Sequence, residues 1–143
     1  MSHAKYSGFE FSPKVGLPVA LVTTDGAGTG VDRLTYSHML ATANATVNSG
    51  TGNVTIKVQD SADNSTGWAD LTPNVVFDNN LASVTTASFP AISTDGVKKL
   101  DVDLSAAKRY IRFVKIASAT GSPSIYLSVV ALLGQRDGTQ PGA

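Results

Sequence analysis

The chain holds few side chains that could do acid–base or nucleophilic chemistry, and they are scattered. The only histidines are His3, near the amino terminus, and His38, which alternates with apolar residues as in a β-strand. An activated nucleophile needs a base and an orienting group beside it, and no motif of that kind surrounds either histidine. Asp101 and Asp103 could in principle form a glycosidase carboxylate pair, but alternating acidic residues are typical of a solvated strand face. We expect no catalytic residues and no enzymatic activity.

The stretch VQDSADNSTGWADLTP, residues 58–73, raises the question of a metal or sugar site. Asp60, Asp63 and Asn64 offer oxygen ligands of the kind that Ca²⁺ prefers, but the EF-hand spacing and its final glutamate are missing. Asp and Asn also form turns by bonding to their own backbone. The pattern favours a turn, so we expect neither a metal ion nor a cofactor.

Trp68 is the only tryptophan and follows this turn. Such a side chain either contacts a ligand such as a sugar from an end loop or forms an apolar lid over one end of the fold. The absence of a second aromatic nearby favours the lid. Gly26, Gly28 and Gly30 resemble a phosphate cradle only superficially, since no Gly-Lys-Ser/Thr follows them, and they indicate turns.

Composition and charge exclude several classes of partner. Lysine plus arginine equals aspartate plus glutamate at 11 each, and only 15% of residues are charged. This balance gives no basic surface for nucleic acid or for an anionic membrane. Cysteine is absent, which excludes disulfides and thiolate metal sites. No apolar signal-peptide core and no membrane-spanning run are visible, so we expect synthesis in the cytoplasm.

The hydrophobic pattern predicts a single all-β domain. Glu10 is the only glutamate, whereas Val, Thr, Ser, Asn and Gly are abundant. Apolar residues recur with period two in several stretches. These are Leu17, Val19 and Leu21; Val54, Ile56 and Val58; Leu100, Val102 and Leu104; and Ile125, Leu127, Val129, Ala131 and Leu133. About eight antiparallel strands in a two-sheet, jelly-roll-like sandwich are expected, with a barrel as the less favoured alternative.

Several local features follow from the same pattern. Residues 41–48 and 53–59 flank the turn SGTG and predict a β-hairpin. The stretch RYIRFVKI predicts a strand in mid-sheet, with Arg112 and Lys115 extending toward its ends.

The domain boundaries are expected at residues 16 and 134. Residues 1–16 are interpreted as an extended N-terminal arm, residues 17–134 as the β-sandwich, and residues 135–143 as a polar C-terminal tail. Tyr6, Phe9 and Phe11 lie in the arm. Exposed aromatics on an arm need a surface to dock on, which is either the domain's own core or a neighbouring protein.

Three stretches resemble a group of small head proteins of tailed bacteriophages: VTIKVQDSADNSTGWADL, KKLDVDLSAAKRYIRFVKI and SIYLSVVALLGQRD. In that group a strand ends in a Q-[DE]-S-x-D-x-S-x-W turn, a Lys/Arg-Tyr-hydrophobic-Arg strand follows, and a last strand closes in Leu-Gly and a basic residue. The matching residues are Gln59–Trp68, Lys108–Arg112, and Leu133–Gly134 with Arg136. The match covers residues 54–137. One extra residue before Trp68, and Gln135 where a proline is common, depart from the pattern.

The resemblance implies a capsid decoration (cement) or auxiliary head protein. Such a structural virion protein binds the major capsid protein on the outer capsid surface, stabilises the head and assembles as a homotrimer or a dimer. The expected contacts with capsid or neighbour are Tyr6, Phe9, Phe11 and Arg136. The same stretches also look like discoidin-type carbohydrate-binding modules, which would make the chain a host-adhesion module of the particle.

Overall fold

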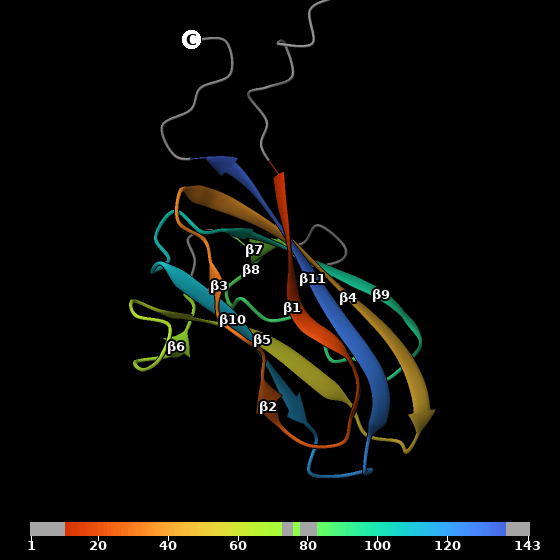
Figure 1. Cartoon of the computed structure of the whole chain (residues 1–143). Helices are drawn as coiled ribbons and strands as arrows, with labels where there is room; N and C mark the ends of the chain where they lie inside the picture. Colours follow the sequence, from red (N-terminus) through yellow and green to blue (C-terminus); the bar gives the residue numbers. More distant parts are fainter. Residues whose placement is uncertain (1–10, 73–75, 78–82, 137–143) are drawn as a thin grey trace, which may run out of the picture.

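The computed structural model describes residues 11–72, 76–77 and 83–136, and these form two antiparallel β-sheets (Figure 1). Tyr6 and Phe9, two of the predicted contact residues, lie outside the described residues. No helix occurs in the described part of the chain, and therefore none that could cross a membrane. The predicted all-β sandwich is confirmed.

The first sheet contains six strands in the order β1-β11-β4-β9-β7-β8. Their bounds are β1 Phe11–Val22, β11 Ser124–Arg136, β4 Tyr36–Ser49, β9 Gly96–Asp103, β7 Val76–Phe77 and β8 Ser83–Val84. The pairs β1·β11, β11·β4 and β4·β9 are long and carry most of the sheet. β1 forms one edge, as Figure 1 shows beside the blue strand β11.

The second sheet contains five strands around β10 and β5. Their bounds are β2 Gly26–Ala27, β3 Val31–Asp32, β10 Tyr110–Ala117, β5 Val54–Ser61 and β6 Ala69–Asp70. β10 lies between β5 and the short strands β2 and β3, so the prediction of a mid-sheet strand is confirmed. The described residues form eleven strands in all, against about eight expected. The excess arises from strands of two residues, which are too short to leave a periodic signal.

The core lies between the sheets and is built from the alternating residues that the sequence singled out. The predicted inward residues of β5, β9 and the segment after it, and β11 are at most 2% exposed. Phe113 and Ile111 of β10 are also fully buried, and they lie in the second sheet together with the β5 residues. In β4 the inward side chains are Met39 and every second residue after it, not His38 or Leu40.

The prediction that Leu17, Val19 and Leu21 share one face of a strand is wrong. Leu17 is buried, whereas Val19 is 77% exposed and Leu21 is 40% exposed. The register of β1 against β11 shifts between Val15 and Leu17 and again between Leu17 and Ala20. Each irregularity inserts unpaired residues and reverses the faces that follow, so Val22 is the next inward residue. A period-two pattern cannot reveal such shifts.

The predicted hairpin over residues 41–59 is also wrong, because its arms belong to different sheets. β4 pairs with β11 and β9, whereas β5 pairs with β10 and β6. The turn between them crosses from one sheet to the other, with Gly50 at a φ of 85°. A second crossing, between β10 and β11, lies against it, where the Thr51 N–H donates a 2.9 Å hydrogen bond to the Gly121 carbonyl. The two arms therefore pack face to face across the core rather than edge to edge.

Both expected domain boundaries fall inside strands. β1 begins at Phe11, so residues 11–16 belong to the sheet rather than to a free arm. β11 ends at Arg136, two residues inside the predicted tail 135–143. Pro13 and Gly16 hide this part of β1 in the sequence, because both residues are depleted in strands.

Candidate functional site

The loop between β5 and β6 is organised by the carboxylate of Asp63. Its Oδ1 accepts hydrogen bonds from the backbone N–H of Ser65 at 2.9 Å and of Thr66 at 2.8 Å. Its Oδ2 accepts one from the Thr66 hydroxyl at 2.8 Å. The hydrogen bonds from the backbone N–H groups of Thr66 and Ser65 hold the pKa of Asp63 well below its usual value. Asp63 thus makes the turn that the sequence favoured for it.

Trp68 lies on the outer side of the five-stranded sheet and is stacked against Arg112. The guanidinium carbon of Arg112 is 4.4 Å from the centre of the indole. The same guanidinium donates two hydrogen bonds to Oε1 of Gln59, at 2.7 and 3.0 Å. Gln59 and Arg112 are register partners on β5 and β10, in phase opposite to the buried residues. Trp68 is therefore held over the sheet face rather than over an end of the core.

A second contact joins the same two stretches of the chain. Asp60 is only 7% exposed, and its Oδ2 accepts a 2.9 Å hydrogen bond from the Lys108 backbone N–H. Ser61 is fully buried and donates from its hydroxyl to the Thr66 carbonyl. The residues of the QDSADNSTGW and KRYIR segments thus meet in one polar cluster. Their geometry indicates a structural role, which is to fix the loop to the sheet.

Three titratable groups gather on the outer face of the six-stranded sheet. Nε2 of His38 on β4 lies 2.8 Å from Oδ1 of Asp101 on β9. Asp103 is the register partner of His38. The Ser105 backbone N–H donates to Asp103 and is the main reason why the pKa of that carboxyl is lowered. We assign this group to the polar and charged margin of the outer face, which is described below.

The outer face of the six-stranded sheet carries an exposed apolar patch over β1 and β11. Val15 pairs with Val130, and Leu21 pairs with Tyr126, so these side chains share one face. Val19 and Tyr126 border the same shallow depression on this face. The patch residues are Phe11, Val15, Val19, Leu21, Tyr126 and Val130, each between 40% and 77% exposed. We name this surface the β1–β11 patch.

Polarity changes in a regular way across this face. Beside the patch, β4 presents Thr42, Asn44 and Thr46, the register partners of β11 residues. Beyond them, β9 presents Lys99 and Asp101. An apolar centre with a polar and charged margin is the usual anatomy of a protein–protein interface. Monomeric proteins rarely leave large contiguous apolar patches exposed without such a use.

The predicted contact residues have different positions. Phe11 is 57% exposed, and its register partner Gly134 lies in phase with Val130, so Phe11 forms one end of the β1–β11 patch. Arg136 ends β11 opposite Tyr36, in the sheet rather than in a tail. The rest of the patch was missed from the sequence. It was missed because the register shifts in β1 turn Val19 and Leu21 outward, and the sequence pattern does not reveal these shifts.

No cluster of three or more His, Cys, Asp or Glu side chains lies close enough to hold a metal ion among the residues that the structure describes. A larger depression of about 240 Å³ lies beside β5 and β6, bordered by Lys57, Asp70 and Ser88 among others. Lys57 and Asp70 form an ion pair there at 2.8 Å. Trp68 is not among its lining residues.

Comparison with known proteins gives a structural likeness. No protein-family model matches the chain, and no curated protein does. The crystal structure of the SPBc2 prophage-derived protein YomS is similar, with a TM-score of 0.59 and 13% sequence identity. The alignment covers 88% of this chain and 94% of that chain. At this identity the likeness shows a shared fold over almost the whole of both chains.

Proposed function

We propose that the chain is a structural protein of a tailed-phage particle that binds the outside of the capsid and stabilises it. The β1–β11 patch is the observation that carries this proposal. Its six apolar residues stand on two adjacent strands, and five of them, all but Val19, lie at paired positions, so most of the surface is formed before binding. A preformed surface loses little conformational freedom when it docks.

The fold likeness supports the phage assignment. YomS is described as a prophage-derived protein, and it shares this fold over most of its length. Binding to the major capsid protein, and assembly as a homotrimer or a dimer, are the finer parts of the proposal. Many copies on a repeating shell would bind with avidity even where each contact is modest.

Docking through the sheet face fits this structure better than the addition of a strand to its edge. β1 is the edge strand, but it contains Pro13 and Pro18, which have no N–H to donate to a neighbouring strand. Prolines and bulges are devices by which edge strands avoid pairing with other chains. The residues of the expected arm that the structure describes are already paired with β11.

The carbohydrate-binding alternative rests on Trp68 and has weaker support. Arg112 covers one face of the indole, so a sugar ring could stack on one face at most.

Quantitative gel analysis of purified particles tests the proposal. A decoration protein is present in a high, fixed ratio to the major capsid protein, and particles that lack it lose their DNA at a lower temperature. An adhesion module would be scarce, and its loss would not change the thermal stability of the head. Absence of the chain from purified particles would overturn the proposal.

A further inference from the structure

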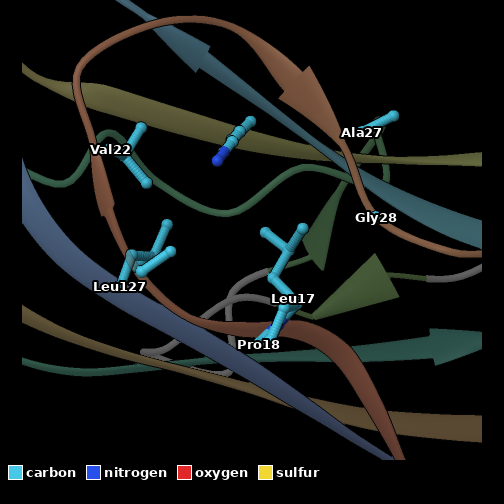
Figure 2. Close-up of a pocket in the computed structure, with 8 residues that line it drawn as sticks. Leu17, Pro18, Val22, Ala27, Gly28 and Leu127 are labelled. Atoms are coloured by element: carbon cyan, nitrogen blue, oxygen red, sulfur yellow. The ribbon is translucent and has the colours of Figure 1, made fainter.

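A small pocket opens between the two sheets at the edge where β1 and β2 lie opposite one another (Figure 2). Its volume is about 120 Å³. The apolar lining residues are Leu17, Pro18, Ala20, Val22, Ala27 and Leu127. In Figure 2, Leu17, Val22 and Leu127 border it on the side of the six-stranded sheet, and Ala27 and Gly28 border it on the other side.

The register shifts of β1 account for this opening. The chain leaves regular pairing with β11 between Leu17 and Ala20, and both residues line the pocket. On the other wall, only a glycine fits at position 28, because a Cβ there would lie 2.2 Å from the Gly16 carbonyl oxygen. The pocket is therefore a built feature of this edge, held by backbone packing on both sides.

One cationic group lines this apolar space. Lys115 on β10 is the register partner of Gly26 on β2, and it has the same phase as Ile111 and Phe113, which point into the core. Its side chain runs past Gly26, with Cε 2.9 Å and Nζ 3.8 Å from the place that a Cβ of residue 26 would take. The missing side chain at Gly26 gives the ammonium its position.

The Lys115 ammonium has no carboxylate within 4.0 Å among the described residues, unlike Lys57, Lys108 and Arg109, each of which has an ion-pair partner. Asp25, which precedes Gly26 in the sequence, accepts a hydrogen bond from the Ala117 backbone N–H at 2.8 Å. A half-buried cation with apolar neighbours and no counter-charge favours an anionic partner, because its hydrogen bonds to an anion are stronger than its hydrogen bonds to water.

We propose that this pocket binds a small free monocarboxylate, with the carboxylate on Lys115 and a short aliphatic body against Leu17, Val22 and Leu127. The volume sets the size, since a cavity of about 150 Å³ holds benzene and the ligand should therefore have roughly six non-hydrogen atoms or fewer. Isobutyrate, with six non-hydrogen atoms, fits this description. Inorganic phosphate and sulfate do not, because they have no apolar surface to place against the walls.

Titration of the ¹⁵N-labelled full chain with isobutyrate tests the site. We expect saturable shifts of the Gly26, Gly28 and Leu127 amide signals, with a dissociation constant on the order of a millimolar for so small a ligand. Isobutyramide has the same shape without the charge, and we expect it to bind about tenfold more weakly or not at all. Equal binding of the amide, or the absence of saturable shifts, would overturn the proposal.

Two variants and a control assign the effect to the ammonium. Lys115→Met keeps the aliphatic stem and removes the charge, and we expect it to bind isobutyrate about tenfold more weakly. Gly26→Ala keeps the lysine but displaces its flexible end, and weaker binding is expected again. Lys57→Met removes a lysine that is paired with Asp70 on the outer face, and it should bind like the unmodified chain. Unchanged affinity in Lys115→Met with native-like spectra would refute the role of the ammonium.

Discussion

The guanidinium carbon of Arg112 lies over the indole of Trp68, 4.4 Å from its centre, on the outer face of the five-stranded sheet. Gln59 holds the other side of the same guanidinium through two hydrogen bonds. The three residues come from β5, β10 and the loop before β6. The stack therefore ties the polar loop between β5 and β6 to the outer face of a sheet.

Removal of the guanidinium should release Trp68. We expect Arg112→Met to shift the tryptophan emission to longer wavelength and to lower the free energy of unfolding by about 1 kcal/mol, the usual size of a partly desolvated cation–π contact. Trp68 is the only tryptophan, so the emission reports this contact alone. Arg109→Met is the matched control, because Arg109 lies over Tyr110 instead, 5.1 Å from its centre. Unchanged emission in Arg112→Met would contradict a structural stack.

A second prediction separates capsid binding from sugar binding. Trp68 and the β1–β11 patch belong to opposite sheets, so Trp68→Ala should leave binding to capsids unchanged while it lowers thermal stability. The measurement is co-sedimentation with heads that lack the chain, together with a glycan screen of both proteins. Sugar binding that disappears in Trp68→Ala would favour the adhesion module over a decoration protein.

The Asp63 loop should lose stability in acid. The folded-state pKa of Asp63 is lowered, chiefly by the backbone N–H groups of Thr66 and Ser65. A lowered carboxyl pKa contributes stability that is fully present above the unfolded value of about 3.9 and is lost as the pH falls through the folded value. We therefore expect the melting-temperature difference between the unmodified chain and Asp63→Asn to be constant above about pH 5 and to shrink below about pH 4.

The comparison with Asp63→Asn is needed because other carboxyl groups contribute in the same direction. Asp32 and Asp70 also have lowered pKa values, the first mainly through Arg109 and the second mainly through Lys57. Their effects cancel in the difference between the two proteins. A difference that stays constant down to pH 2 would show that Asp63 does not hold the loop.

Alternation was a sufficient guide where a strand is regular and half-buried. The inward residues of β5, β9 and β11 were predicted because each of these strands presents apolar residues to the core at every second position. The relation between strands was not predictable in this way. The crossing at Gly50 looks like a hairpin turn in sequence, because both crossings and hairpins use glycine at positive φ.

The candidate surface was hidden for a related reason. Val19 and Leu21 continue the pattern of Leu17, and only the register shifts against β11 turn them outward. Polar clusters that join distant segments, such as Asp60 with Lys108, are set by the pairing of β5 with β10. Phe11 was found because an aromatic among Ser, Gly and Pro stands out without any knowledge of pairing.

Gly16 should be required for the packing of the two sheets. A Cβ on Gly16 would lie 2.4 Å from Cδ2 of Phe113, which is fully buried in the other sheet. Gly16→Ala should therefore lower the free energy of unfolding by roughly 1–3 kcal/mol, as overpacked cores do. Gly26→Ala is the control, because its methyl group meets only the flexible end of Lys115. Urea denaturation of the three proteins measures the effect, and equal stability of Gly16→Ala and the unmodified chain would contradict this packing.

A charge placed in the β1–β11 patch should weaken binding to capsids without unfolding the chain. Val19 is 77% exposed, so Val19→Asp should change the free energy of unfolding by less than about 0.5 kcal/mol, as surface substitutions usually do. A buried, unpaired carboxylate at an interface is costly, and we expect affinity for capsids to fall about tenfold or more.

Val97→Asp is the matched control. Val97 is 58% exposed on the outer face of the same sheet, but it lies on β9, which β4 and β11 separate from β1. Co-sedimentation with capsids and analytical ultracentrifugation of the free proteins give the two readouts. Loss of binding in both variants alike would indicate general charge repulsion, and full binding by Val19→Asp would exclude the patch as the contact surface.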